Sequence, residues 1–516
     1  MAQVSAPFHA RAAAGPAWLL LACLVFFTSA ATSLARESAT FDEPVYVVAG
    51  LAQLTLRDFT LKEDAPPLVP HLAGLAPWWL GLRIPGGRIP FDDSLAREYA
   101  YATRVLYGSA QADRILSGSR LALLILFGLL LLGSVHAFAR DLFGPAAAPV
   151  ALGLTALCPN LLAHGGLVSA DFPCAAAMLF ASYRLWRFAA EPGAARGLLA
   201  GLALGLALVT KFTALLLAPA AAAVLLLWTW QAPAGARLAR GIRALVLVAL
   251  PAAALVSLAW GWPPDPRHYA RGLATLYRNA RTDYPWFLAG RFYEGGVVWY
   301  YPAVLALKSS LPLLLLGTAG ALCALRRRAP GLGLACLLLP PALLLAAASQ
   351  DLVSAGLRRV LAVLPVLAVL GGAVAAHSRR ARAAALVLLL AHALSSARAW
   401  PHYLPYFNEA ALALRPPEEW LDDSNVDWGQ DLKALPAALR RAGVERVVLW
   451  YFGMADPRTY GLDFELMAPG HHAGPVPGVY AVSQHHLIRH PGHWLRRRQP
   501  FARAGTSILL FRIHDR

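Results

Sequence analysis

Long apolar segments recur along this chain from residue 17 to about residue 397, and they constrain its fold more than any other feature. Only 15% of the 516 residues are charged, whereas about 25% are charged in a typical soluble domain. A soluble core does not require repeated segments of the length that crosses a bilayer, which is about 20 residues for a helix. The sequence therefore predicts an α-helical polytopic membrane protein.

We expect about eleven transmembrane helices. The first is expected to be an uncleaved signal anchor rather than a cleaved signal peptide, because later spans also hold the chain in the membrane. The fifth and sixth spans meet at Lys211, and an alternative in which they form one bent helix would invert everything after them. The expected spans are 17–34, 118–139, 145–160, 172–190, 196–210, 212–230, 244–262, 299–324, 331–348, 360–377 and 383–397.

The placement of arginine predicts the orientation. With eleven spans, the clusters at Arg140, 184–196, 237–243, 326–328 and 379–382 all fall on one side, which should be cytoplasmic. Ten spans would scatter them over both faces. The N-terminus is then cytoplasmic, and the chain is expected in a bacterial inner membrane.

The net charge of +17 comes mainly from short loops and the last quarter of the chain. Topology explains this excess better than nucleic-acid binding, for which no motif is present. The five cysteines lie in or beside apolar segments, so neither a disulfide framework nor a metal site is indicated.

Two domains are expected. Residues 1–397 should form the transmembrane domain, with a long outer loop at 35–117 in which 65–82 is an interfacial helix that anchors Trp78 and Trp79. Residues 398–516 should form a small extracytoplasmic α/β domain. Its expected elements are a helix at 430–443 and strands at 444–453, 478–483 and 507–513.

Several segments place ionisable residues at the outer face. Each has an ordinary structural explanation: capping for Asp42 and Asp171, snorkelling for Lys211, and headgroup anchoring for the arginines. Their coincidence on one face favours a functional site. The residues are Asp42, Glu43, Glu63, Asp64, His164, Asp171, Lys211, Arg358 and Arg359.

These residue types suit the transfer of a group from a lipid-linked phosphate. A carboxylate can act as general base toward an acceptor hydroxyl, and cationic side chains can hold the departing phosphate. The phosphate of a lipid with a polyprenyl tail would lie at the depth where the spans meet water.

Seven sequence segments, in order and with sensible spacing, resemble the GT-C membrane glycosyltransferases of family 39, which are related to protein O-mannosyltransferases and to the aminoarabinose transferase of lipid A. The resemblance covers residues from about 17 to 440. The segments include "TFDEPVYVVAGLAQLTLRDFTL…APPLVPHLAGL", "HGGLVSADFP", "GLALGLALVTKFTALLLAP", "GGVVWYYPAVLALKSSLPLLLLG", "GLRRVLAVLPVLAVLGG", "PHYLPYFNEA" and "DDSNVDWGQDL".

The resemblance implies an inverting enzyme that uses a polyprenyl-phosphate sugar. Asp42 would be the general base with Glu43 beside it, and Asp171 would be the second acidic residue. Lys211 and one of Arg358 or Arg359 would contact the donor phosphate. The acceptor would be a hydroxyl of a protein or a lipid, and membrane lipids would be further partners.

The stretch before "PPL" departs from the family pattern. The family usually has Glu followed by His or Lys, whereas this chain has Glu63, Asp64 and Ala65. Ala65 removes the basic or metal-ligating group, which argues against a divalent metal here and puts the loop's contact with the phosphate in question. No other cofactor is expected.

The segment "DDSNVDWGQDL" offers Trp428 for stacking on a sugar and Asp427 as an acceptor contact, with helix capping as the alternative. Its spacing does not fit a calcium-binding loop. Two other functional classes stay open at this point. One is a transporter or flippase of lipid-linked sugars, and the other is a catalytically degenerate scaffold.

Overall fold

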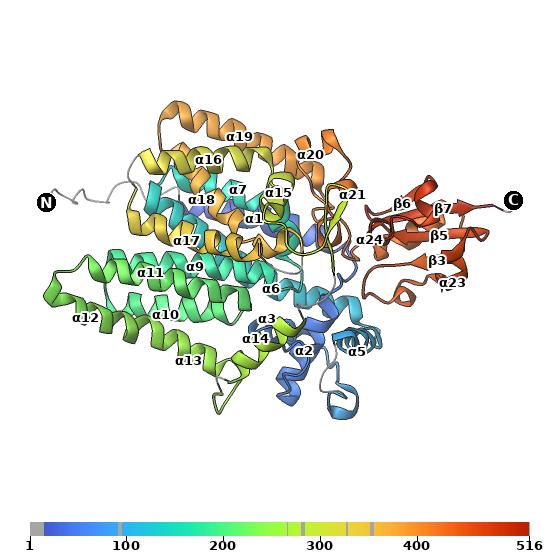
Figure 1. The fold of residues 1–516 in the computed structure, drawn as a ribbon, viewed down its shortest axis with the longest axis horizontal. Coiled ribbons are helices and arrows are strands. Elements are labelled where there is room, and N and C mark those ends of the chain that lie inside the picture. The colour runs from blue at the N-terminus through green and yellow to red at the C-terminus, as the bar shows by residue number, and fades with distance from the viewer. Residues whose placement is uncertain are drawn as a thin grey trace.

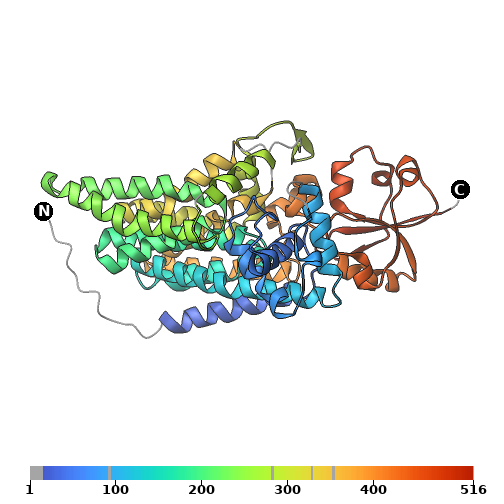
Figure 2. The same cartoon turned by 90° about the horizontal axis from the view of Figure 1, so that it is seen from below.

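The structure is a computed structural model that describes residues 15–90, 95–265, 267–279, 284–326, 329–350 and 355–514. Long helices run side by side along the longest axis of the molecule, and a small sheet with its own helices covers one end of this bundle (Figures 1 and 2).

Each expected span corresponds to a helix, to a helix continued from another helical turn, or to a bent pair of helices. These elements are α1 (Gly15–Leu34), α6 (Ala112–Phe143), α7 (Ala147–Ala156) with α8 (Pro159–Gly165), α9 (Asp171–Ala190), α10 (Ala194–Leu208), η2 (Phe212–Leu216) with α11 (Leu217–Trp230), α12 (Ala234–Ala244) with η3 (Leu245–Ala249) and α13 (Leu250–Leu258), α15 (Tyr300–Lys308) with α16 (Leu311–Arg326), α17 (Gly331–Ala348), α18 (Val363–Ala375) and α19 (Arg379–Ala399).

Fewer than the eleven expected elements are both long enough and apolar enough to count as membrane spans. Within the described residues, six helices are long and apolar enough to cross a membrane, and bent pairs raise the number to eight. The apolar helices α10 and α18 are shorter, and α9 carries Asp171, Arg184 and Arg187. The structure confirms the polytopic helical class. The expected number of eleven spans is reached only if α9, α10 and α18 are counted together with the other eight.

The outer loop folds into short helices rather than one interfacial helix. They are α2 (Glu43–Leu56), α3 (Leu68–Ala73), α4 (Leu75–Trp79), η1 (Pro85–Gly87) and α5 (Leu95–Tyr107). Gly50 lets α2 approach α3 closely, because a Cβ there would lie 1.8 Å from the Pro70 oxygen. Trp78 and Trp79 are 56% and 82% exposed, and their expected position at headgroup depth stays a prediction.

A second connection, between α13 and α15, contains α14 (Arg267–Asn279) and a hairpin of β1 (Trp286–Leu288) and β2 (Arg291–Tyr293). The chain then returns to the bundle through α15 and α16, which meet at a bend of 116°. Lys308, Ser309 and Ser310 lie at this bend and are buried.

The C-terminal sheet has five strands in the order β4-β3-β5-β7-β6. β3 is parallel to β4 and β5, whereas β7 is antiparallel to β5 and β6. The expected small α/β unit is confirmed, and β4 and β6 add to the three expected strands. The strands are β3 (Arg446–Trp450), β4 (Asp463–Leu466), β5 (Gly478–Ser483), β6 (Ala502–Ala504) and β7 (Ile508–Ile513).

Short helices surround this sheet and join it to the bundle. They are α20 (Glu409–Leu414), α21 (Pro417–Trp420), η5 (Asp423–Asn425), η6 (Leu432–Ala434), α22 (Leu435–Arg441), η7 (Pro457–Tyr460), α23 (Pro469–Ala473), α24 (Gln484–Arg489) and η8 (Trp494–Arg497). The expected helix at 430–443 corresponds to η6 and α22. The domain boundary at residue 397 stays a prediction.

Candidate functional site

Asp42 stands at the N-terminus of α2 with its carboxylate directed to other segments of the chain. It occupies the expected N-cap position, but its side chain makes no capping hydrogen bond. Its Oδ1 accepts a hydrogen bond from the Tyr99 hydroxyl at 2.8 Å, and its Oδ2 accepts one from Arg358 Nη1 at 2.9 Å. The Asp42 side chain is 15% exposed, so water or a ligand can reach it.

Asp171 joins the same group of charges from the start of α9. Its N-cap residue is Ala170, so Asp171 does not cap the helix as expected. Asp171 Oδ1 accepts a hydrogen bond from Lys211 Nζ, and its Oδ2 lies 3.7 Å from Arg358 Nη1. Arg358 therefore stands between the two carboxylates, and Asp42, Arg358, Asp171 and Lys211 form one row of alternating charge. We call these four residues the open cluster.

The outer positions of this row keep contact with solvent. The Lys211 side chain is 26% exposed and that of Arg358 is 19% exposed, whereas the Asp171 side chain is only 3% exposed. Burial lowers the pKa of Arg358, but Asp42 and Asp171 raise it more, so the pKa lies above its usual value. The guanidinium is thus held charged next to a partly accessible carboxylate.

Arg358 is positioned by the loop of residues 422–432. The Arg358 guanidinium lies over the Trp428 ring, 4.3 Å from its centroid. Asn425 accepts a hydrogen bond from the Leu357 backbone N–H at 3.1 Å. Gly356 has φ +66°, and a Cβ there would lie 2.5 Å from the Asn425 side chain. The contact therefore requires glycine, both for its backbone conformation and for its size.

The same loop holds the segment that carries Asp42. The Ser38 N–H donates to the Gln430 carbonyl at 2.9 Å, and the Phe41 N–H donates to the Trp428 carbonyl at 3.0 Å. The Ser38 hydroxyl donates to the Gly429 carbonyl at 2.8 Å. One loop thus fixes Asp42 and Arg358 relative to each other, although it follows them by about 390 and 70 residues.

Trp428 and Asp427 lie inside this interface rather than on its surface. Trp428 is 2% exposed with one face under Arg358, and Asp427 is fully buried. The Asp427 carboxylate accepts hydrogen bonds from the backbone N–H groups of Gly429 and His485, while burial raises its pKa to about 7. In this structure both side chains support the loop, and neither is presented to a sugar.

Glu43 points into a different environment from Asp42. It is fully buried, and Arg120 donates to both of its oxygens at 2.8 and 2.6 Å. Thr40 donates through its N–H and its hydroxyl, and the Val168 N–H donates at 2.9 Å. We call Glu43 with Arg120 and their backbone partners the closed network. The structure does not bring Glu43 into the open cluster.

The "EDAPPL" stretch divides between two neighbours. Glu63 accepts a hydrogen bond from the Thr275 hydroxyl of α14 at 2.7 Å. Asp64 forms an ion pair with Lys62 at 2.9 Å. Lys62 Nζ also lies 5.5 Å from the centroid of the Tyr46 ring. Lys62, a residue with φ +60°, therefore places a cation beside Asp64, three residues before Ala65.

The two remaining expected residues lie beside the open cluster. His164 is 2% exposed, its ring centroid lies 6.3 Å from that of Trp428, and its Nδ1 makes no hydrogen bond among the described residues. Arg359 follows Arg358 in η4 (Leu357–Val360) and is half-buried. Arg358 contacts both Asp42 and Asp171.

Sequence reasoning missed three residues here: Tyr99, Arg120 and Lys62. Tyr99 comes from α5, and burial together with Asp42 raises its pKa well above the usual value. Arg120 lies in the expected second span, where a buried arginine should have signalled a carboxylate partner. Lys62 directly precedes the departing stretch. Within the described ranges, no group of three His, Cys, Asp or Glu side chains could hold a metal ion.

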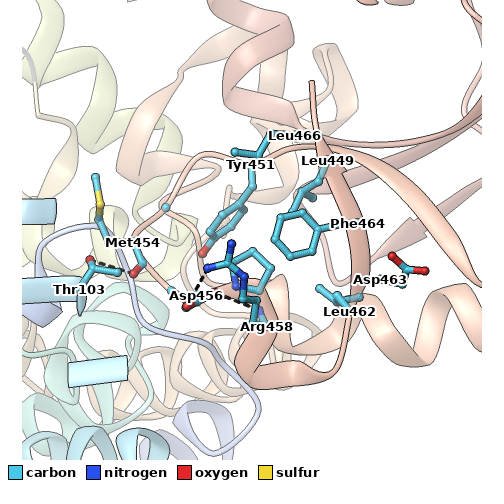
Figure 3. A pocket seen from close by; sticks show the side chains of 13 residues that line it. Thr103, Leu449, Tyr451, Met454, Asp456, Arg458, Leu462, Asp463, Phe464 and Leu466 are labelled. Atoms are coloured by element: carbon cyan, nitrogen blue, oxygen red, sulfur yellow. Dashed lines mark hydrogen bonds and ion pairs between the residues drawn. The ribbon is translucent and has the colours of Figure 1, made fainter. Parts of the chain in front are cut away.

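A separate cavity of about 680 Å³ lies between α5 and the edge of the sheet. Figure 3 shows Leu449, Phe464 and Leu466 on its apolar side and Asp456 with Arg458 on its polar side. Thr103 of α5 donates to the Met454 carbonyl at 3.2 Å, and both residues line the cavity. Phe452, which lies between the lining residues Tyr451 and Gly453, stacks on Phe41 with ring centroids 5.2 Å apart. Because Phe41 directly precedes Asp42, the cavity wall contacts the segment that carries Asp42.

Comparison with known proteins gives one family match and several similar structures. Residues 117–262 match the family described as dolichyl-phosphate-mannose-protein mannosyltransferase. No curated protein matches.

Three solved structures similar to this chain are compared by sequence identity, by the share of each chain that is covered and by TM-score. ArnT from Cupriavidus metallidurans bound to undecaprenyl phosphate is 16% identical, with 97% of this chain and 98% of that chain covered and a TM-score of 0.48. Its apo state is also 16% identical, covers 96% and 98%, and has a TM-score of 0.49. The apo oligosaccharyltransferase of Archaeoglobus fulgidus is 15% identical, covers 75% and 55%, and has a TM-score of 0.45.

The matched segment runs from α6 to the residues after α13, and it includes both Asp171 and Lys211. Asp42 and Arg358 lie outside it and meet those residues only in the folded chain. The family match confirms that this chain resembles the GT-C membrane glycosyltransferases of the protein O-mannosyltransferase type.

Proposed function

We propose that this protein is an inverting glycosyltransferase that moves a sugar from a polyprenyl-phosphate donor to a hydroxyl of a protein or lipid acceptor. One observation carries the proposal. Asp42, Asp171, Lys211 and Arg358 come from four distant segments and meet in one partly accessible row of ion pairs. The family match over 117–262 supports the same class of reaction.

Asp42 is the proposed general base. The acceptor O–H gives its proton to the Asp42 carboxylate while the acceptor oxygen forms a bond to the anomeric carbon. The bond from that carbon to the phosphate oxygen breaks, and the electron pair leaves with the polyprenyl phosphate. A single displacement of this kind inverts the anomeric carbon.

Arg358 and Lys211 are the proposed phosphate contacts. Both are cationic and keep 19% and 26% of their side chains exposed, so a donor phosphate can approach them without unfolding of the site. Arginine can offer a phosphate two parallel N–H groups. Asp171 keeps both cations in place, since it contacts Lys211 directly and lies 3.7 Å from Arg358.

The position of the site favours transfer at a membrane surface. All four residues lie at the ends of bundle helices or in connections, and Arg358 lies over Trp428 of the loop 422–432. With the expected orientation, this surface is the outer side of a bacterial inner membrane, and the sheet domain covers it. A transporter would more often place such residues at the bilayer midplane.

The direct test compares wild-type cells, deletion cells and deletion cells complemented with Asp42→Asn. Mass spectrometry of envelope proteins and lipids should find a hexose or pentose that is lost in the deletion strain and restored by wild type. Asp42→Asn should lower transfer by about 10²- to 10⁴-fold, which is the usual contribution of a general base. The abundance of the variant in the membrane should be unchanged.

Asp265→Asn is the matched control, because Asp265 makes a local surface ion pair with Arg267. This variant should restore the sugar as wild type does. Transfer by Asp42→Asn at the wild-type rate would refute the base assignment. Activity that requires sealed vesicles and is absent from detergent solution would instead identify a transporter.

A further inference from the structure

Four arginines converge on a pocket at the end of the bundle opposite the sheet domain. The pocket has a volume of about 230 Å³, whereas a single water needs only about 10–15 Å³ of such space. It lies where the ends of α6 and α9 meet the start of α10. Its polar lining consists of Arg140, Asp141, Tyr183, Arg184, Arg187 and Arg196.

Carboxylates neutralise only part of this positive charge. Asp141 accepts a hydrogen bond from Arg140 at 2.8 Å and one from the Tyr183 hydroxyl at 2.7 Å. Glu191 pairs with Arg187 at 2.9 Å and with Arg196 at 2.7 Å. Four guanidinium groups thus share two carboxylates, so the pocket carries an excess of positive charge.

Arg184 has no carboxylate partner among the described residues. Its guanidinium lies over the rings of Phe180 and Tyr183, at 5.1 and 5.5 Å from their centroids. Its Nε is buried and makes no hydrogen bond within the part of the chain that the structure describes. A buried guanidinium donor without an acceptor is costly, and an anion in the pocket would remove that cost.

This pocket is distinct from the open cluster. Arg184 follows Asp171 by 13 residues on the same helix, which corresponds to about 20 Å along the helix axis at about 1.5 Å per residue. A ligand at one end of α9 therefore cannot contact the other end unless it spans the bundle.

Topology alone accounts for arginine at this end of the bundle, because cytoplasmic loops are enriched in basic residues. It requires only that the charges lie near the membrane surface. It does not require that they enclose a space, or that one of them lacks a partner. The enclosure and the unpaired Arg184 Nε point instead to a ligand.

We propose that this pocket binds a phosphate group, either in the headgroup of an anionic lipid or as a free phosphate. Arginine suits phosphate through two parallel charge-assisted hydrogen bonds, and basic pockets between membrane helices are known to take lipid headgroups. The proposal does not depend on the sugar transfer proposed for the open cluster.

An apolar groove along α10 favours a lipid as the source of the phosphate. Leu199 lines the basic pocket, and its neighbour Leu198 lines a groove of about 430 Å³ together with Leu202 and Leu258. Leu198 and Leu202 are 47% and 40% exposed. A phospholipid with its headgroup among the arginines could lay a hydrocarbon chain along these leucines.

The test is a binding titration of the purified full-length chain in detergent, followed by native mass spectrometry. The wild-type protein should bind phosphatidylglycerol with an affinity at least tenfold higher than the double variant Arg184→Gln/Arg196→Gln does. The matched control is Arg379→Gln/Arg380→Gln, which removes the same charge from exposed positions at the start of α19 and should bind as wild type does.

A parallel calorimetric titration with inorganic phosphate separates the two sources. If the wild type binds phosphatidylglycerol but not inorganic phosphate, and the pocket variant loses this binding, the pocket is a lipid site. If it binds inorganic phosphate but not phosphatidylglycerol, with the same loss in the variant, the pocket is a site for free phosphate. Arg184→Lys/Arg196→Lys keeps the charge and should retain part of the affinity, provided that size-exclusion profiles match. If the pocket and control variants bind both probes equally, the proposal is wrong.

Discussion

Asp42 and Glu43 are adjacent in the chain, but their carboxylates lie in two opposite kinds of environment. Among the described residues, Asp42 accepts two hydrogen bonds, from Tyr99 and Arg358, and keeps some exposure to solvent. Glu43 accepts five, from Arg120, Thr40 and Val168, and is fully buried. Because a carboxylate has about four lone-pair sites, Glu43 is saturated, whereas Asp42 has sites left for a substrate.

The comparison teaches how structure and chemistry can be divided between neighbouring residues. The closed network joins the loop before α2 to α6 and to the Val168 turn, so its charge serves to fix those segments. The open cluster stands on that fixed base. Three of its four side chains remain reachable, which is the property a reacting or ligand-binding group needs.

Glu43→Gln should cause the largest loss of stability of the variants at this pair. The amide cannot pair with the Arg120 charge, and breaking one partner of a buried ion pair costs about 3–5 kcal/mol. Chemical denaturation in detergent should show this loss in the free energy of unfolding. Asp42→Asn should lose less, because its pair with Arg358 is partly solvated. Equal losses in the two variants would contradict the division between open and closed.

The sequence predicted much of the fold because apolar length and strand alternation are local signals. The strands at 478–483 and 507–513 agree with β5 (Gly478–Ser483) and β7 (Ile508–Ile513). The number of membrane spans was harder to predict, since α9 carries charges at both ends and α10 is short.

The site was only partly predictable. The coincidence of acids and bases on one face indicated Asp42, Asp171, Lys211 and Arg358, which do meet. The sequence could not separate Asp42 from Glu43, because the separation depends on Arg120, a residue 77 positions away. Trp428 was expected to face a sugar, but it lies beneath Arg358. Such contacts depend on tertiary packing, which no local pattern encodes.

Arg358→Lys tests whether the open cluster needs the shape of arginine as well as its charge. Lysine keeps the positive charge but loses the planar contact with Trp428 and the Nε hydrogen bond to the Ala355 carbonyl. We expect transfer to fall on the order of 10- to 100-fold, less than for removal of the base. The measurement is the rate of sugar transfer in detergent with a saturating lipid-phosphate sugar.

Arg359→Lys provides the matched control for that substitution. Arg358 contacts both carboxylates, and Arg359 is the next residue of the same short helix and is half-buried. Arg359→Lys should therefore keep transfer within about twofold of wild type, in the range expected for a residue outside the charge-stabilising set. A larger loss in Arg359→Lys than in Arg358→Lys would reverse the assignment of the phosphate contact.

Glu37 gives the prediction with the smallest expected effect. It is a buried carboxylate beside the closed network, and few hydrogen bonds or ion pairs among the described residues offset the cost of its burial. It is 5% exposed and accepts a hydrogen bond from the Ser33 hydroxyl at 3.2 Å. Burial raises the pKa of Glu37 to about 7, although Arg120 lowers it. The unfolded chain loses this proton near pH 4.5, whereas the folded chain keeps it until about pH 7.

The sign of the pH dependence follows from this difference. The stabilising contribution of protonated Glu37 is fully present below pH 4.5 and is lost as the pH rises through about 7. Between pH 5.5 and pH 7.5 the loss is about 2 kcal/mol. Glu37→Gln keeps an oxygen for Ser33 but cannot ionise, so its unfolding free energy should fall less over this interval by that amount. Parallel pH profiles for wild type and Glu37→Gln would show that the closed network compensates Glu37 as fully as it does Glu43.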